Sequence, residues 1–528
     1  MFRKFSVVLL AALATQAHAG NQKDITLEVV GTYATGVYAQ GGAEISAHDS
    51  ETQRLFTVNA SKNGIDIIDI SNPALPAFIK TIDLSSIGTQ ANSVAWHDGV
   101  LAAAIEASPK QAPGALAFYD AEGNLLSSLT ICALPDMVTW TPNGKFVLAA
   151  CEGEPDSSYA VDPEGAVAIV EVNGDAAGVT PSDLRLAGFT AFNGNVPAGV
   201  RVFGPNASAA QDFEPEYITV SHDSKTAWVT LQENNAFAIV DIDNAQVTRV
   251  VPLGFKNHSA PGNALDPSDR DGPSNTASIK IANWPVFGMY LPDSIASFRS
   301  KGRTYLVTAN EGDSRSSAGF DEERRVGTNI GPNAVILDPT AFPNAAALKG
   351  NAQLGRLKIT STLGDTDNDL DFDALYVFGA RSMTVWDDNG VQIADTGDEL
   401  ERQTAVGGRF NSDNAANNSF DQRSDDKGPE PEGLAVGKAF GRTYAFLGLE
   451  RIGGIVVYDL DVPTQPRFVT YINNRNFAGS AALGTAGDLG PEGILYIEAD
   501  DSPTDENLVV VSNEISGTAT IYRVVKVK

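Results

Sequence analysis

Four short runs between Glu216 and Leu253 decide the fold. They are Glu216-Tyr-Ile-Thr-Val-Ser221, Thr226-Ala-Trp-Val-Thr-Leu231, Ala236-Phe-Ala-Ile-Val-Asp241 and Val247-Thr-Arg-Val-Val-Pro-Leu253. Each run is rich in β-branched and aromatic residues, and residues typical of turns separate it from the next. Four such strands in one repeating unit are typical of a β-propeller blade.

Similar units recur along the chain. The other copies span Glu44–Ile70, Ser93–Tyr119, Asp136–Val172, Asp293–Asn310, Glu432–Leu460 and Glu492–Val525. Further strand-like runs between Leu354 and Asp398 either complete the fifth unit or form an eighth. We therefore expect an all-β protein with a single β-propeller of YVTN/WD40-like four-stranded blades. Seven blades are favoured and eight remain the alternative.

The last unit shows only three strands before the chain ends. The run Ile25–Val30 can supply the fourth and close the ring without an open sheet edge. No low-complexity linker divides the chain, so we expect residues 20–528 to form one domain.

Residues 1–19 have the pattern of a signal peptide. Arg3 and Lys4 precede the apolar run Phe5–Ala14, and Ala17-His-Ala19 fits a cleavage site. No later segment is long enough to span a membrane as a helix. We expect an exported protein that is either periplasmic or extracellular, and association with the cell surface is compatible with this expectation.

The composition is strongly acidic, with a formal net charge of −29. Such a surface excludes nucleic acid as an obvious partner, because phosphate backbones require basic faces. It favours cations, although solubility alone explains many acidic residues in an exported protein.

Strand order predicts a ring of acids at one mouth of the channel. In an antiparallel blade, the start of the first strand lies beside the end of the second. The first strands open near Glu44, Asn92, Asp136, Glu216, Asp293, Glu432 and Glu492, and the second strands end near Asn59, Glu106, Glu152, Glu233, Glu311, Glu450 and Glu514. Because innermost strands line the channel, these side chains should converge.

Converging carboxylates without a cation would repel one another and raise each other's pKa. Calcium, a hard cation that takes oxygen ligands, is the first choice outside the cell, and another divalent metal is the alternative. The expected ligands are Glu152, Glu154, Glu216, Glu311, Asp313, Glu432, Glu492 and Glu514. The simpler interpretation is that these acids terminate strands and accept hydrogen bonds from backbone N–H groups.

Long connections are expected on the same face as the acids. They comprise residues 173–212, 254–290, 312–352, 395–430 and 472–490. These connections carry Arg315, Lys427 and Arg475, and Arg381 and Arg451 lie in other connections at that face. Phosphate or carboxylate clamps are one interpretation and pairing with local acids is the other. His258 is the one histidine expected near this mouth, because His48, His97 and His222 fall in turns at the opposite rim.

Two further features predict local structure. Asp365, Asp367 and Asp369 have the opening spacing of a calcium loop, but the central Gly and the terminal Glu of that motif are missing. We expect a second, structural calcium site there, with an acidic solvated loop as the alternative. Cys132 and Cys151 flank paired strands of the third unit and should form a disulfide after export; two buried thiols are the alternative.

Several motifs together resemble the choice-of-anchor I family. They include Asn310-Glu-Gly-Asp-Ser-Arg315, Ser424-Asp-Asp-Lys-Gly-Pro-Glu-Pro-Glu-Gly433 and Gly487-Asp-Leu-Gly-Pro-Glu-Gly493. The resemblance covers nearly the whole mature chain. It implies a propeller in an extracytoplasmic setting, and it extends to mesenchyme-specific cell-surface glycoproteins and to bacterial proteins labelled alkaline phosphatase. Family members often carry a C-terminal sorting signal, and none is visible here.

Two functions follow as hypotheses. The first is a calcium-dependent phosphoesterase, with Arg315, Arg451 and Glu311 as candidate catalytic residues and a phosphate ester as substrate. The second is a non-catalytic calcium-binding surface or matrix protein that binds an extracellular polymer, a mineral or another protein. No residue uniquely marks a nucleophile.

Overall fold

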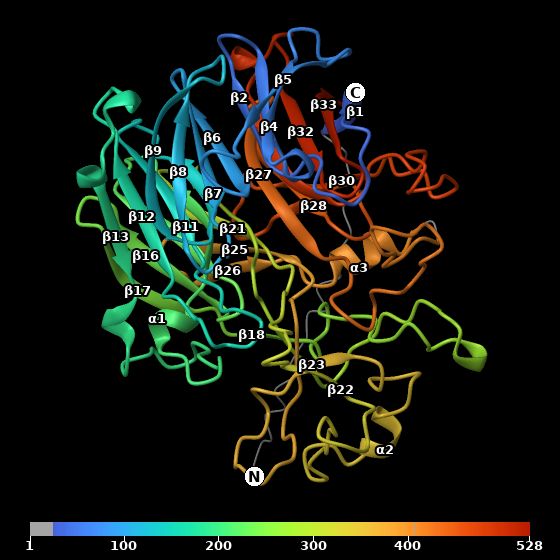
Figure 1. Ribbon diagram of the computed structural model, residues 1–528. Helices are drawn as coiled ribbons and strands as arrows, with labels where there is room; N and C mark the ends of the chain where they lie inside the picture. Colours follow the sequence, from blue (N-terminus) through green and yellow to red (C-terminus); the bar gives the residue numbers. More distant parts are fainter. Residues whose placement is uncertain (1–24, 407, 528) are drawn as a thin grey trace, which may run out of the picture.

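A computed structural model describes residues 25–406 and 408–527. The expected signal peptide therefore lies outside the described residues, as do residues 20–24. Within these residues, seven four-stranded antiparallel sheets follow one another around a central axis, so the predicted β-propeller is confirmed (Figure 1).

The first four of these sheets are built from consecutive strands. They are β2–β5 (Ser46–Asp49, Arg54–Asn59, Gly64–Asp69, Ala77–Asp83), β6–β9 (Gln90–His97, Val100–Glu106, Pro113–Tyr119, Leu125–Ala133), β10–β13 (Pro135–Trp140, Phe146–Cys151, Ala166–Glu171, Leu184–Gly188) and β14–β17 (Pro215–Val220, Thr226–Leu231, Ala236–Asp241, Gln246–Pro252).

The remaining three sheets include one interrupted by an insertion and one that joins the two ends of the described chain. They are β20, β21, β25 and β26 (Ile295–Ser300, Arg303–Ala309, Met383–Asp387, Gln392–Asp395), β27–β30 (Pro431–Ala439, Arg442–Leu449, Ile455–Asp459, Arg467–Ile472), and β31–β33 with β1 (Pro491–Ile497, Leu508–Asn513, Thr518–Lys526, Ile25–Ala34). The run around Met383 thus completes the fifth sheet, one of the two alternatives from the sequence.

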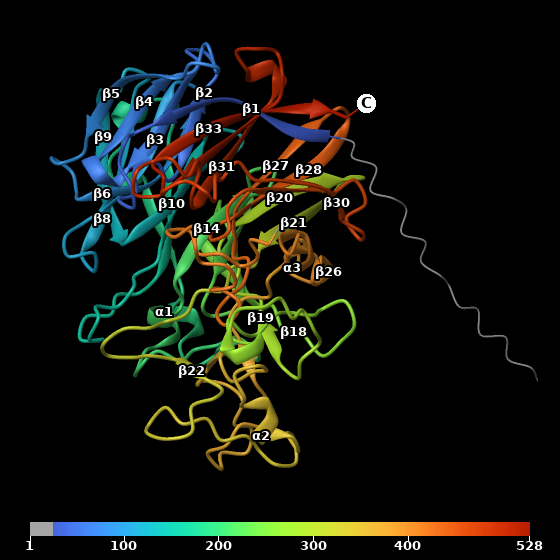
Figure 2. The same cartoon turned by 90° about the vertical axis from the view of Figure 1, so that its right-hand side faces the viewer.

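The ring closes as the sequence predicts. Strand β1 pairs antiparallel with β33, from Ile25 opposite Lys526 to Ala34 opposite Thr518. Figure 2 shows the N-terminal strand beside the C-terminal one. This pairing gives the last sheet its fourth strand and leaves β33 without a free edge.

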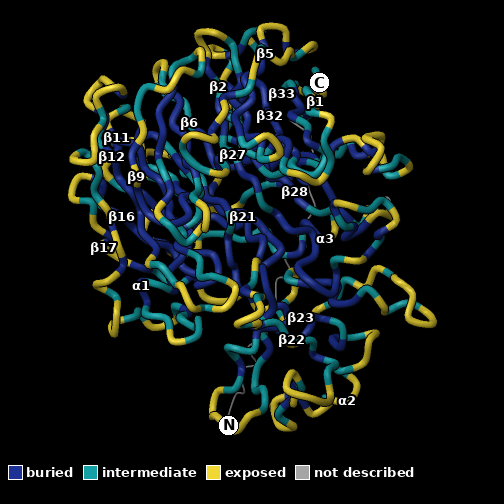
Figure 3. The backbone as a smooth tube through the Cα atoms, viewed as in Figure 1, coloured by how far each residue is buried: buried dark blue, intermediate teal, exposed yellow. Residues whose placement is uncertain are grey.

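The core lies between neighbouring sheets. Alternate side chains of one sheet pack on those of the next, as Leu148 and Ile169 of one sheet do with Val229 and Ala238 of its neighbour. The burial pattern follows this arrangement, with buried strands and exposed turns (Figure 3).

The long connections form a second, smaller layer of structure. Strands β18 (Phe255–Asn257), β19 (Phe287–Met289) and β24 (Tyr376–Val377) form one sheet, and β22 (Glu323–Arg325) pairs with β23 (Lys358–Thr360). The connections also contain α1 (Ala209–Asp212), α2 (Ala345–Leu348) and α3 (Glu399–Thr404). The short 3-10 helices are η1 (Ala60–Lys62), η2 (Ala176–Gly178), η3 (Pro181–Asp183), η4 (Thr190–Phe192), η5 (Pro273–Asn275) and η6 (Ala499–Asp501).

These insertions gather on one side of the propeller, as expected. Figure 1 shows α1, β18, β22, β23 and α2 toward the lower side of the view. Segments 254–290 and 312–377 share a core of their own, in which Leu265, Trp284, Val335, Leu357 and Leu375 are buried. The propeller thus carries its elaborated connections on a single face.

Candidate metal centre

A repeated local register places acids at the channel mouth. Pro135, Pro215, Pro431 and Pro491 each open an innermost strand and pair with Cys151, Leu231, Leu449 and Asn513, respectively. Proline fits there, because the first residue of an edge strand has no ladder hydrogen bond to lose. In each sheet the residue after the proline is acidic: Asp136, Glu216, Glu432 and Glu492. This recurring Pro–acid pair is a sequence signal for the ring that strand order alone did not use.

The mouth holds a cavity of about 400 Å³. Its wall contains all eight acids predicted as ligands, Glu152, Glu154, Glu216, Glu311, Asp313, Glu432, Glu492 and Glu514. It also contains Asp136, Glu233, Asp293 and Glu450, which strand order placed at this mouth but which were not among the chosen ligands. The structure therefore brings twelve carboxylates to one cavity.

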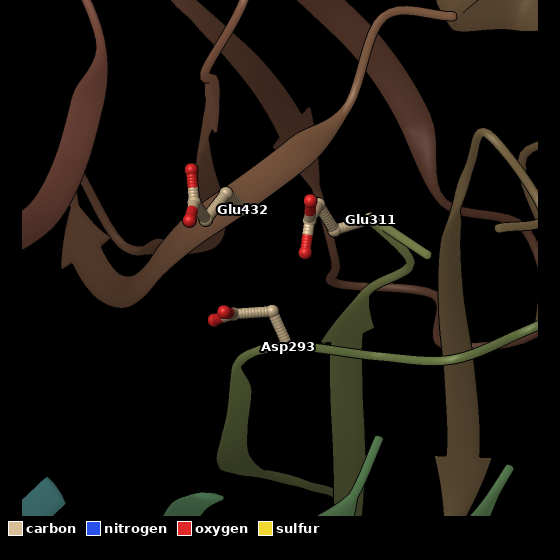
Figure 4. Close-up of side chains that lie close together, drawn as sticks. All are labelled: Asp293, Glu311 and Glu432. Carbon is tan, nitrogen blue, oxygen red and sulfur yellow. The ribbon is translucent and has the colours of Figure 1, made fainter. Parts of the chain in front are cut away.

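Three of these acids are close enough to share an ion. The carboxylates of Asp293, Glu311 and Glu432 each offer an oxygen within 4.8 Å of the other two. Figure 4 shows the three side chains around one gap, reaching it from different strands or strand ends. Glu311 also lies within the same distance of Glu430 and Glu450, so it belongs to two groups.

Burial and mutual repulsion raise the pKa values of acids in the ring. Burial raises the pKa of Glu216 well above its usual range, and the charges of Glu233 and Asp293 raise it further. Burial also raises the pKa of Glu432 well above its usual range, with a further contribution from Glu492. Since a raised pKa reports a carboxylate whose charge is poorly compensated, these groups would gain from a bound cation.

Two basic side chains reach the same cavity. Lys427 lies 3.3 Å from Glu311 and also contacts Asp313, while Arg451 lies 2.8 Å from Glu450 and 3.1 Å from Glu430. Burial alone would lower the pKa of Lys427, but the charges of Glu311 and Asp313 raise it above its usual range. Both cations therefore stay charged beside the acids.

Arg315 lies beside the ring cavity and is paired with acids. This side chain is only 8% exposed and pairs with Asp212 and with Glu214, the latter at 3.0 Å. It lines a neighbouring recess and not the ring cavity, so its charge is consumed by structural ion pairs. Arg315 therefore pairs with acids, which is one of the two interpretations from the sequence, whereas Arg451 lines the ring cavity.

Arg381, Arg475 and His258 are also structural. Arg381 is buried and donates at 2.6 Å to Glu401, and Arg475 donates to backbone carbonyls such as that of Arg451 at 2.9 Å. His258 is buried inside an insertion, where Nδ1 lies 2.7 Å from the carbonyl oxygen of Asn263. His258 is therefore not among the described residues that line the ring cavity.

The second candidate site changes its third member. Asp365 and Asp367 form a group with Asp373, with oxygens within 4.8 Å of one another, and Asp373 forms a second such group with Asp338 and Asp371. The Asp365 carboxylate accepts backbone N–H groups of Asn368 and Leu370, at 2.7 and 3.1 Å. The loop therefore folds back on Asp365, which the linear spacing could not show.

Cys132 and Cys151 form a disulfide at the same rim. The sulfur atoms are 2.06 Å apart and the Cα atoms 5.8 Å apart. Cys151 ends β11 and pairs with Pro135, so the register that places Asp136 beside Glu152 also brings the two cysteines together.

A known protein family matches the chain over most of its length. The choice-of-anchor I domain model matches residues 44–463, which is most of the chain. The chain belongs to the choice-of-anchor I family. Among the described residues, no helix of this choice-of-anchor I chain has the length and apolarity that a membrane crossing requires.

Two characterised relatives are similar to this choice-of-anchor I chain. Gigasin-3a of Magallana gigas is 30% identical over 194 residues, which cover 34% of the chain and 67% of that protein. The mesenchyme-specific cell surface glycoprotein of Strongylocentrotus purpuratus is 27% identical over 287 residues, which cover 49% of the chain and 36% of the glycoprotein. The choice-of-anchor I chain thus spans about a third of the glycoprotein's length.

Solved structures similar to this choice-of-anchor I chain are distant. A hydrazine synthase chain of Kuenenia stuttgartiensis covers 93% of it at 11% identity with a TM-score of 0.46, and 99% of that chain is covered. The β-propeller domain of Cps50 (Swd1) from Myceliophteria thermophila covers 94% at 9% identity with a TM-score of 0.43, and 99% of that chain is covered. Streptogramin B lyase covers 95% at 9% identity with a TM-score of 0.44, and 98% of that chain is covered.

Proposed function

We propose that this exported propeller binds a divalent cation, with calcium as the expected ion, in the carboxylate-lined mouth of its channel. The observation that carries the proposal is the group Asp293, Glu311 and Glu432, whose oxygens lie within 4.8 Å of one another in a cavity with nine further acids. Carboxylate oxygens are the ligands that hard cations prefer.

The donor set supports calcium over softer metals. Soft ions select thiolate and imidazole ligands. Both cysteines are consumed in the disulfide, and His48, His97 and His222 line recesses other than the ring cavity. The cavity therefore offers oxygen ligands, and calcium accepts more varied ligand numbers and geometries than the strict octahedron of magnesium.

Elemental analysis of the protein, purified without chelator and dialysed against metal-free buffer, tests this proposal. Calcium or another divalent metal should copurify with wild type and be depleted from the double variant Asp293→Asn/Glu432→Gln. Glu51→Gln, an exposed change in the turn after β2, is the matched control and should keep the metal. A wild-type protein that neither retains metal nor binds added calcium would sink the proposal.

Phosphoester hydrolysis is a second candidate at the same site. The observation that favours it is the position of Lys427 and Arg451, two cations in the wall of the cavity that holds the acids. A bound metal would supply charge for phosphate oxygens and activate water. Arg451 and Lys427 would orient a phosphate by charge-assisted hydrogen bonds, with Glu311 holding Lys427 in place.

A panel of phosphomonoesters and phosphodiesters, assayed with calcium and with chelator, tests the hydrolase candidate. Calcium-dependent turnover that falls in Arg451→Met but persists in Arg315→Lys would support it. Absence of turnover on every substrate in calcium would remove it and leave the cation site untouched.

A non-catalytic surface role is favoured by the relatives. The family and the similarity to a protein named as a cell surface glycoprotein fit a surface or extracellular protein. In this role the cation would bridge the ring to anionic groups of a polymer, a mineral or another protein. Calcium-dependent retention on an anionic polysaccharide matrix, with no turnover on the ester panel, is the result expected for it.

A further inference from the structure

The twelve acids of the cavity fall into two classes by charge balance. Four of them make ion pairs: Glu154 with Lys110, Glu311 and Asp313 with Lys427, and Glu450 with Arg451. The other eight, Asp136, Glu152, Glu216, Glu233, Asp293, Glu432, Glu492 and Glu514, make no ion pair within residues 25–406 and 408–527. One divalent cation would offset only a quarter of these eight charges.

Three of the four balanced acids, Glu311, Asp313 and Glu450, lie on one arc of the ring. Beside the group of Asp293, Glu311 and Glu432, the acids Glu430 and Glu450 are held by basic side chains. Arg423 donates at 2.6 Å to Glu430, and Arg451 contacts both Glu430 and Glu450. On this arc the protein supplies its own counter-ions, so one metal at Asp293, Glu311 and Glu432 suffices.

The adjoining arc has four acids that make no ion pair, and the charges of Lys110 and Arg315 act on Glu152 and Glu233 only from the neighbouring recess. Asp136 and Glu152 lie at paired ends of β10 and β11, and Glu216 and Glu233 lie at the corresponding ends of β14 and β15. Strand β10 packs beside β14, so the two pairs are neighbours in the wall of the cavity.

Glu233 shows that these acids are set in fixed positions. It is 8% exposed, lines the cavity, and its Oε2 atom has no hydrogen-bond partner among the described residues. Its turn is held tightly: Asn235 N–H donates to the Gln232 carbonyl at 2.9 Å, and Arg201 donates at 2.7 Å to the carbonyl of Glu233 itself. A buried carboxylate oxygen without a partner is costly unless a ligand satisfies it.

Glu216, at the start of the neighbouring strand β14, also has a buried carboxylate oxygen without a partner. Its Oε2 atom is buried and has no hydrogen-bond partner among the described residues, although the side chain lines the cavity. Two unsatisfied oxygens on one arc call for a cation there, because the basic side chains of the other arc are already committed to Glu311, Glu430 and Glu450.

We propose that the cavity binds two divalent cations, the second held by Asp136, Glu152, Glu216 and Glu233 and separate from the one at Asp293, Glu311 and Glu432. This inference rests on the proposed cation-binding function and states its stoichiometry and the ligands of the added site. Two divalent ions and the built-in Lys427 and Arg451 bring the cavity much closer to charge balance than one ion does.

Calorimetric titration of chelator-stripped protein with calcium chloride tests the inference. Wild type should bind two calcium ions per chain. Glu216→Gln/Glu233→Gln should bind one, through the site that it leaves intact, and Asp293→Asn/Glu432→Gln should also bind one. Glu51→Gln, an exposed change in the turn after β2 and outside the cavity, should still bind two.

The possible failures are distinguishable. No binding to wild type overturns the proposed function and this inference together. One ion bound by wild type and by Glu216→Gln/Glu233→Gln, but none by Asp293→Asn/Glu432→Gln, overturns the second site and leaves the proposed function standing. Two ions bound by Glu216→Gln/Glu233→Gln also overturn the assignment.

Folding of the glutamine variant is checked independently. Glu216→Gln/Glu233→Gln removes two unpaired like charges, so in chelator it should melt at or above the temperature of wild type. If it melts lower, the single variant Glu233→Gln is titrated instead. Binding of two ions by that variant with unchanged affinities overturns the role of Glu233.

Discussion

Glu311 lies beside both a basic side chain and other acids of the cavity. Its carboxylate accepts a hydrogen bond from Gln232 at 2.9 Å, lies 3.3 Å from Lys427, and shares a gap with Asp293 and Glu432. A ligand that is already oriented by neighbouring donors loses little freedom on binding a cation, so Glu311 should contribute strongly to affinity.

Glutamine at Glu311 or at Glu432 should weaken calcium binding by at least about tenfold, equivalent to about 1.4 kcal/mol, because each change removes a charged oxygen ligand. His222→Gln is the control, since His222 lines a recess at another rim. Calcium titration of the three variants measures this. Equal affinities in all three would mean that the acids at the mouth do not bind the ion.

Arg315 pairs with acids that lie far from it in the sequence. It joins Asp212 and Glu214 in a buried network. Arg315→Ala leaves two buried carboxylates uncompensated, and we expect the free energy of unfolding to fall by about 3–5 kcal/mol. Denaturant unfolding in calcium checks this. A loss below about 1 kcal/mol would show that the pairs are not strongly coupled.

For single residues, the sequence predicts which acids converge at the channel mouth but not which basic side chains pair with them. Strand starts and ends follow from local patterning, so Glu152, Glu216 and Glu492 could be placed at the mouth. The partners of Lys427 and Arg315 lie more than a hundred residues away along the chain, and no local pattern encodes such contacts.

The blade strands that carry the ring of acids can be predicted from the sequence. Alternating β-branched residues and turn chemistry predict each blade strand, and the closing strand β1 was also predicted. The three-residue strands β18, β22 and β23 were not, because strands this short are stabilised by the separate core around Trp284 and Leu357 and not by local propensity.

The disulfide ties β11 to the end of β9, the last strand of the preceding sheet. The cysteines are 19 residues apart, and closing a loop of this size stabilises by roughly 3 kcal/mol in the chain-entropy model. Denatured, unreduced protein exported from cells should therefore contain no free thiol. Reduction should lower the denaturant midpoint. Two free thiols per chain, measured with a thiol reagent, would refute the bond.

The whole molecule combines a closed ring of sheets with a charged cavity at one mouth. The pairing of β1 with β33 completes the last sheet, and the packed sheets hold the acids close together although they repel. The stability of the ring should therefore depend on what compensates its charge, which is protons at low pH and metal ions when they are present. The signal peptide at residues 1–19 stays a prediction.

Without metal, stability should fall as pH rises. Burial raises the pKa of Glu44 to about 8 and that of Asp136 to about 6, above the values of the unfolded chain. The folded protein therefore binds more protons than the unfolded one between about pH 4.5 and about pH 8, and its stability decreases across this window. Melting curves in chelator at about pH 5.5 and about pH 8 measure the effect. A higher melting temperature at the higher pH would contradict it.

The melting temperature in calcium and in chelator at about pH 8, where the ring carries most charge, tests the central claim most directly. An ion that binds only the folded state stabilises it by mass action, by about 2.7 kcal/mol per site at roughly 100 times the dissociation constant. The account predicts a clear rise of the melting temperature in calcium. Coincident curves in calcium and in chelator would contradict it.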